Sequence, residues 1–116
     1  MSWKICAMVA ALAAGLTGCG SAPVPAENVT QAKSSISAAE AVGAQSVPKA
    51  ALHLKMAKDQ VAQAEAMITD GETEEAKLVL LRAQSDAELS LALAREASLR
   101  AEAQAALKKV QELQAQ

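Results

Sequence analysis

The stretch that decides the fold is residues 48 to 69, PKAALHLKMAKDQVAQAEAMIT. Its apolar residues recur at intervals of four and three, namely Ala50, Leu54, Ala57, Val61, Ala64 and Ile68. This spacing places one narrow apolar seam along a helix of about residues 47–69, which must pack against other helices. Pro48 fits the first helical turn, where no N–H is needed, and Thr69-Asp70-Gly71 ends the helix.

The C-terminal segment, about residues 73–114, contains no proline and no glycine. It is predicted to form one helix of roughly 60 Å at 1.5 Å per residue. Two apolar stripes run along its first half: Ala76, Leu80, Ala83, Ala87, Leu91 and Ala94, and beside them Leu78, Leu81, Ser85, Leu89 and Ala92. Two stripes predict two neighbouring helices.

An N-terminal helix over about residues 28–43 supplies the second neighbour. Asn28 is predicted to cap it, with Gln31 at the capping-box spacing, and Gly43 to end it before a new cap at Ser46. The apolar positions Val29, Ala32, Ile36, Ala39 and Gly43 follow helical spacing. We therefore expect an all-α domain over residues 28–116, an antiparallel helical hairpin or three-helix bundle with a long, coiled-coil-like C-terminal helix.

The far end of the long helix extends beyond the reach of its shorter neighbours. It carries a further seam at 4-3-4-3 spacing: Leu99, Ala103, Ala106, Val110 and Leu113. A seam without an intramolecular partner indicates self-association or docking to a helix of another protein. The alternative is a frayed terminal helix, because the seam is rich in alanine and barely two heptads long.

The first residues have the features of a secretory signal peptide. Lys4 lies in a short basic segment, and residues 5–16 form an uncharged apolar run of about 12 residues, whereas a membrane-spanning helix needs about 20. Leu16-Thr17-Gly18-Cys19 then resembles the lipobox of bacterial lipoproteins. We expect cleavage after residue 18; an uncleaved N-terminal membrane helix is the alternative.

The lipobox resemblance assigns a role to each residue around the cleavage site. It implies that the signal peptidase recognises Leu16, Thr17 and Gly18, and that Cys19 becomes the acylated, palmitate-bearing first residue. Gly20, in place of aspartate, implies sorting to the periplasmic side of the outer membrane. Residues 19–27, with two prolines, are expected to be a flexible tether.

Composition disfavours several functions. Alanine makes up about a quarter of the chain, the only aromatic residue, Trp3, precedes the cleavage site, and the formal net charge is −2. The chain lacks the aromatic residues needed to stack on bases and the excess of basic residues needed to neutralise phosphates. We therefore expect no nucleic-acid partner and no small-molecule substrate. Cys6 leaves with the signal peptide and Cys19 is acylated, so no thiol remains for a disulfide or for catalysis.

Catalytic and metal sites are also not expected. His53, the only histidine, is interpreted as a solvated helical residue, and its spacing to Met56 and Met67 supports a copper site only weakly. The acidic turn of Asp70, Glu72, Glu74 and Glu75 lacks the pattern of a calcium loop. We expect no enzyme activity, no cofactor and no metal.

Charged residues along the long helix are expected to form surface pairs one turn apart or close to it. The pairs are Arg82 with Asp86, Glu88 with Arg95, and Glu96 with Arg100.

Residues spread over the helical domain resemble a bacterial envelope family, domain of unknown function 4398. They are Ala39-Glu40-Ala41-Val42-Gly43-Ala44, Val47-Pro48, Leu54, Ala57-Lys58, Gly71-Glu72, Ala76, Ala83 and Asp86-Ala87-Glu88-Leu89. The resemblance covers about residues 27–95 and implies small alanine-rich helical lipoproteins. Family tyrosines are absent at Ser46 and Thr73, and no OmpA-like domain follows, so peptidoglycan binding is not implied.

Together these observations lead to one functional hypothesis and one alternative. We expect a non-enzymatic, lipid-anchored periplasmic helical module at the outer membrane, with a structural or protein-interaction role. The alternative is a peptidoglycan-associated envelope spacer similar to the small major lipoprotein. That protein is tethered through a terminal lysine, whereas this chain ends in Gln114-Ala115-Gln116.

Overall fold

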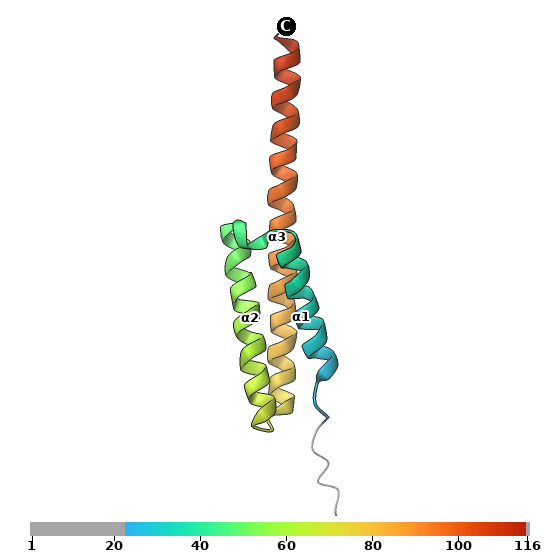
Figure 1. Cartoon of the computed structure of the whole chain (residues 1–116), viewed down its shortest axis with the longest axis vertical. Coiled ribbons are helices and arrows are strands. Elements are labelled where there is room, and N and C mark those ends of the chain that lie inside the picture. The colour runs from blue at the N-terminus through green and yellow to red at the C-terminus, as the bar shows by residue number, and fades with distance from the viewer. Residues whose placement is uncertain (1–22, 116) are drawn as a thin grey trace, which may run out of the picture.

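The computed structural model describes residues 23–115, and these form an all-α, antiparallel three-helix arrangement (Figure 1). The elements are α1 (Ala26–Ala41), a 3₁₀ turn η1 (Ala44–Ser46), α2 (Pro48–Thr69) and α3 (Thr73–Gln114). Helix α3 packs against both α1 and α2, which also contact each other, and continues far beyond both of them. The predicted fold class and the long C-terminal helix are confirmed; the predicted signal peptide lies outside the described residues.

The seam of α2 is buried as predicted. Ala50, Leu54, Ala57, Val61 and Ala64 are buried, and Ile68 is partly buried. Pro48 is the first helical residue, but the N-cap is Val47 and not the predicted Ser46, which belongs to η1.

Helix α2 ends at the predicted turn. Gly71 has a φ of 86°, a left-handed conformation that glycine adopts without steric cost. The N–H of Glu72 donates to the carbonyl of Met67 (2.8 Å) and that of Gly71 to Ile68 (3.1 Å). This pair of bonds is a Schellman motif, which satisfies the last carbonyls of α2 and reverses the chain directly into α3.

Helix α1 begins at Ala26, two residues before the predicted Asn28. Pro25 is the N-cap and is buried, and the side chain of Gln31 bonds that of Glu27 instead of closing a capping box. The capping prediction at Asn28 is therefore wrong, because Pro25 offers a preset φ and a carbonyl that accepts from Val29 (3.1 Å). The last residues of the predicted tether, 26 and 27, belong to the helix.

The core of the bundle consists almost entirely of small side chains. All its buried apolar residues are alanines except Ile36, Leu54, Val61 and Leu80. Alanine brings helix backbones close together but buries little apolar area per residue, so this core stabilises the bundle less than a leucine core of the same length would. Close contact between backbones, more than bulk, defines the packing.

Helix α3 buries one stripe, not the two predicted. The buried residues are Ala76, Leu80, Ala83, Ala87, Ser90 and Ala94, so Ser90 takes the place predicted for Leu91. The second predicted stripe is wrong: Leu78, Leu81, Ser85, Leu89 and Ala92 are all exposed. Helices α1 and α2 pack on the narrow alanine stripe and on its partly buried flanks, Val79, Leu91 and Leu93. They leave Leu78, Leu81 and Leu89 exposed to solvent.

Candidate functional site

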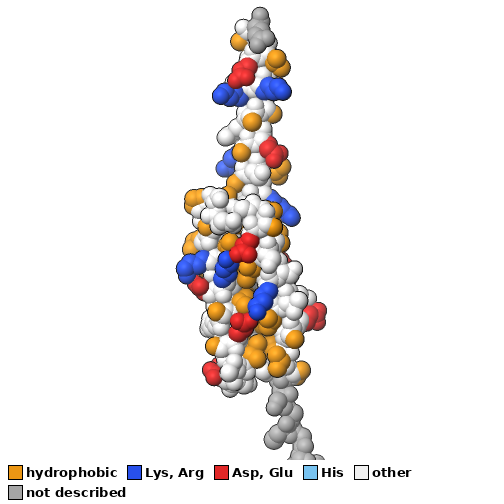
Figure 2. Space-filling view, in the orientation of Figure 1, with side chains coloured by type: hydrophobic (Ala, Val, Ile, Leu, Met, Phe, Trp, Pro, Cys, Tyr) orange, Lys and Arg blue, Asp and Glu red, His pale blue; other side chains and the backbone are white. Residues whose placement is uncertain are grey.

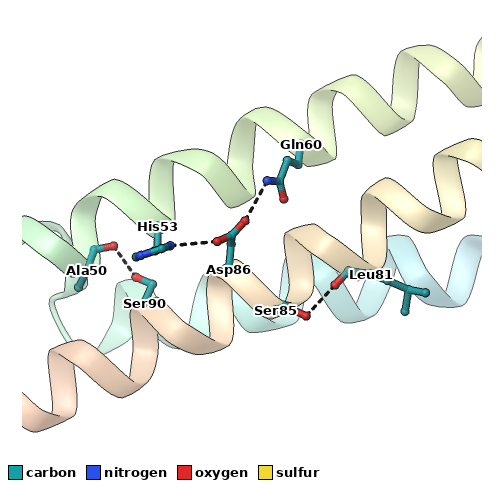
Figure 3. A network of polar contacts seen from close by, with 7 residues as sticks. All are labelled: Ala50, His53, Gln60, Leu81, Ser85, Asp86 and Ser90. Carbon is teal, nitrogen blue, oxygen red and sulfur yellow. Dashed lines mark hydrogen bonds and ion pairs between the residues drawn. The ribbon is translucent and has the colours of Figure 1, made fainter.

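A polar network links α2 to α3 at the edge of the core (Figure 3). Asp86 of α3 contacts Nδ1 of His53 through one carboxylate oxygen and accepts from the side-chain amide of Gln60 through the other, both at 2.9 Å. The side chain of His53 is 27% exposed and that of Asp86 is 15% exposed. The interpretation of His53 as a solvated residue is therefore wrong: Asp86, 33 residues away in the chain, is its partner.

The hydroxyl groups near this network are already engaged. The buried Ser90 hydroxyl donates to the carbonyl of Ala50 on α2 (2.7 Å), and the Ser85 hydroxyl donates to the carbonyl of Leu81 (Figure 3). Neither hydroxyl donates to His53, which is the contact a nucleophile-base pair would use. The carboxamide oxygen of Gln60 is buried without a partner. The contacts of Asp86 and Ser90 with α2 fix the register of α2 on α3.

The candidate metal ligands are not gathered into a site. His53 contacts Asp86, while Met56 is exposed and Met67 packs partly buried against the core. Within residues 23–115, no three His, Cys, Asp or Glu side chains come close enough together to hold a metal ion. The acidic residues at the α2–α3 turn include Glu74 and Glu75 in the first turn of α3, where carboxylates stabilise the helix dipole.

Of the three predicted surface pairs, only Glu96 with Arg100 forms. Asp86 is occupied by His53 and Gln60 and not by Arg82, and the Glu88 carboxylate accepts from Gln84 (2.8 Å) and not from Arg95. Two further ion pairs join α1 to α2: Lys33 with Glu65 (2.6 Å) and Lys58 with Glu40 (2.5 Å). Exposed pairs of this kind contribute up to about 1 kcal/mol each.

The last part of α3 projects from the bundle as a single helix. We call residues 98–114 the overhang; every residue in it is exposed. The predicted seam lies here, with Leu99 65%, Val110 50% and Leu113 63% exposed, and Ala103 and Ala106 also exposed. Leu107, which the seam did not include, is 64% exposed beside it. Figure 2 shows apolar side chains interspersed with charged ones along the projecting end.

A second exposed apolar surface lies on the part of α3 inside the bundle. We call Leu78, Leu81, Ser85, Leu89 and Ala92 the outer stripe; Leu78 is 67% exposed, and Leu81 and Leu89 are 43% exposed each. It is turned away from α1 and α2, because residues two apart, such as Leu78 and the buried Leu80, point in nearly opposite directions on a helix. The sequence carried a signal for this surface, its regular spacing, but not the side to which it would face.

The predicted lipidation and sorting residues, Leu16, Thr17, Gly18, Cys19 and Gly20, lie outside the described residues. The described part of the chain enters α1 at the end of the bundle opposite to the overhang (Figure 1). In that part, none of the helices combines the length and the apolar character needed to cross a membrane.

Comparison with known proteins identifies one family. The family model described as a domain of unknown function (DUF4398) matches residues 27–114, whereas no curated protein and no solved structure matches the chain. The match extends beyond the region of sequence resemblance and includes the overhang. Since it spans α3 to its end together with nearly all of α1 and the whole of α2, the chain belongs to the DUF4398 family.

Proposed function

We propose that the protein is a non-enzymatic, lipid-anchored helical interaction module on the periplasmic side of the outer membrane. In this proposal the three-helix bundle is a scaffold, and the exposed apolar side of α3 is the docking element. The observation that carries the proposal is the overhang, residues 98–114, a helix that carries an apolar seam covered by no described residue.

The bundle itself offers little for chemistry and much for positioning. The partly buried Asp86 and the buried Ser90 are engaged in contacts between α2 and α3. Those contacts, the Schellman turn and the ion pairs between α1 and α2 hold α3 in one orientation. A rigid support of this kind orients the overhang for a partner, because a projecting helix that is already ordered loses less conformational entropy on binding.

The overhang is part of the family domain and not an appendage to it, since the family match continues to residue 114. Isolated helices of this length are marginal in water, and most helical stability in proteins comes from packing. An apolar seam in such a segment is stabilised when a partner helix covers it.

Anchoring rests on the sequence alone, through Leu16-Thr17-Gly18-Cys19 and the apolar run before it. Stable attachment to a bilayer requires more than one acyl chain, which lipidation of the cysteine would supply. The expected location on the outer membrane follows from Gly20 in the sorting position.

A Cys19→Ser variant tests the anchor. It should stay unprocessed, as seen by a larger mass on denaturing gels, and should lack incorporated palmitate. The matched control is Cys6→Ser, which should be cleaved and acylated as in the wild type, because Cys6 precedes the cleavage site. Normal processing and acylation of the Cys19→Ser variant would refute lipid anchoring.

A photoreactive residue in place of Val110 tests the docking element in cells. Val110 lies on the seam, and the matched control position, Lys108, lies on the far side of the same helix. Protein crosslinks from position 110 with far weaker ones from position 108 are expected. Equal labelling from both positions, or none from either, would refute docking through the seam.

A further inference from the structure

The seam of the overhang and the outer stripe of the bundle form one continuous exposed face. Residues seven apart on an α-helix differ by only about 20° in direction, so they line one side. Starting at Leu78, every seventh residue of α3 is small or apolar, and all of them are exposed: Leu78, Ser85, Ala92, Leu99, Ala106 and Leu113. Leu89, Ala103 and Val110 lie beside them and are exposed as well. We call these nine residues the outer face.

Four charged residues at the edge of the outer face alternate in sign. Glu88, Arg95, Glu102 and Lys109 are seven residues apart, and all are exposed. Within the described chain, no ion pair engages any of the four: Glu88 and Glu102 accept only from the neutral side chains of Gln84 and Ser98. Their order along the helix is negative, positive, negative, positive.

This order is complementary to itself when the helix is reversed. In an antiparallel pair of identical helices, edge residues on the same side face one another, the first of one copy with the last of the other. Glu88 then meets Lys109 of the second copy, and Arg95 meets Glu102 of the second copy. The two-fold axis repeats both contacts, which gives four ion pairs of opposite charge.

A parallel pair has the opposite electrostatics. Arg82 and Glu96 continue the row of Leu89, Ala103 and Val110 at seven-residue spacing. In a parallel pair in register, each residue of this row meets its own copy, so Glu96 meets Glu96 and Arg82 meets Arg82. The edge residue Arg95 then faces Arg100 of the second copy, five positions further on. Like charges at such short separation are unfavourable, so the charge pattern selects the antiparallel orientation.

The antiparallel register also matches the two exposed surfaces in length. It places residues 98–114 of one copy over residues 81–97 of the other, so each overhang covers most of the outer stripe of its partner. In two layers of the pair a large residue meets a small one: Leu89 lies against Ala106, and Val110 lies against Ser85. Such size alternation permits close packing. In a third layer Ala92 meets Ala103. Glu96, which is paired with Arg100 of its own copy, lies against Leu99 of the second copy and not against the second Glu96.

We propose that α3 pairs with α3 of a second copy of this chain, antiparallel and centred between Ala97 and Ser98, through the outer face. The inference rests on the proposed function, in that it names the occupant of the docking element as a second copy. It adds that Leu81 and Leu89 of the outer stripe, left uncovered by the bundle, belong to the interface.

Charge reversal tests both the partner and the orientation. Two differently tagged full-length copies are expressed together and co-purified after mild detergent solubilisation. Arg95→Glu in both copies should reduce co-purification at least about tenfold, because two ion pairs become repulsions, and Glu102→Arg in both copies should do the same. An Arg95→Glu copy mixed with a Glu102→Arg copy should recover wild-type levels, since the reversed charges match again.

Lys108→Glu is the matched control, because it makes the same change of charge on the far side of the helix and should leave co-purification unchanged. Helicity by circular dichroism checks that the exposed substitutions leave the fold intact. Failure of the mixed pair to recover would overturn the proposal. So would stronger association of the Arg95→Glu variant, since that result marks a parallel pair.

The photocrosslinking at position 110 separates this inference from the proposed function. Crosslinks between two copies of the chain support both proposals. Crosslinks to a different protein alone overturn the second copy as occupant but leave the docking element in place. Absence of crosslinks overturns both.

Discussion

The two halves of α3 have similar compositions and opposite surroundings. Residues 73–97 bury a stripe of mostly alanines against α1 and α2, whereas residues 98–114 are exposed on every side. Leucines occur in both halves, but Leu80 is the only leucine of α3 that is fully buried. In this alanine-rich bundle, the position of a residue relative to the neighbouring helices, and not its hydrophobicity, decides whether it is buried. Most leucines of α3 therefore mark surfaces that the described chain does not cover.

The largest difference between the halves is expected from one leucine in each. Leu80→Ala should lower the free energy of unfolding by about 2–5 kcal/mol, because it leaves a cavity in a core with few large side chains. Leu107→Ala should change it by no more than about 0.5 kcal/mol, since Leu107 is exposed. Urea unfolding in dilute solution measures both. Similar losses for the two variants would mean that the overhang is covered within the monomer.

The next largest difference in stability is expected when one carboxylate in each half of α3 is replaced by alanine. Asp86→Ala should lower the free energy of unfolding by about 1–3 kcal/mol, because it leaves His53 and Gln60 without their shared partner between α2 and α3. Glu102→Ala, which removes an exposed contact with Ser98, should cost far less. A double-mutant cycle of His53→Ala and Asp86→Ala, followed by thermal unfolding, measures the coupling. A coupling energy near zero would show that the contact does not stabilise the helix pair.

The smallest difference is expected from two serines. Ser90→Ala removes a buried hydrogen bond to the carbonyl of Ala50 and should cost about 0.5–1.5 kcal/mol. Ser98→Ala removes an exposed bond of 3.4 Å and should have no measurable effect on stability. Chemical unfolding of both variants under the same conditions decides the matter, and an unchanged midpoint for Ser90→Ala would contradict its structural role.

The sequence predicted the elements of the fold better than their faces. The seam of α2 follows from the spacing of its apolar residues, and the turn follows from Gly71, which adopts a positive φ. The uninterrupted length of α3 follows from its lack of helix breakers. The face that α3 turns inward does not follow from such patterns. Both of its stripes have helical spacing, and only tertiary packing decides which one α1 and α2 cover.

The polar network was missed for a related reason. His53 and Asp86 are 33 residues apart, and no local motif connects them. Each nevertheless lies one position from a buried residue of its own helix, Leu54 and Ala87. Polar residues at such flanking positions on two antiparallel helices are the signal that could have predicted the contact. The start of α1 shows the same limit, since burial of Pro25 outweighed the capping preference of Asn28.

With the proposed lipid anchor, the opposite positions of the overhang and the N-terminal end of α1 constrain how the protein is oriented at a membrane. Helix α3 is about 63 Å long at 1.5 Å per residue, and in an antiparallel pair the two α1 N-termini lie at opposite ends of an assembly at least that long. Seven residues, 19–25, span at most about 25 Å when extended. Two copies acylated at Cys19, as proposed, therefore could not both reach one bilayer while the pair stands upright. A single anchored copy would be able to extend α3 away from the bilayer. A pair anchored to a single membrane would have to lie along its surface. Association would therefore turn α3 from an upright orientation to one parallel to the lipid.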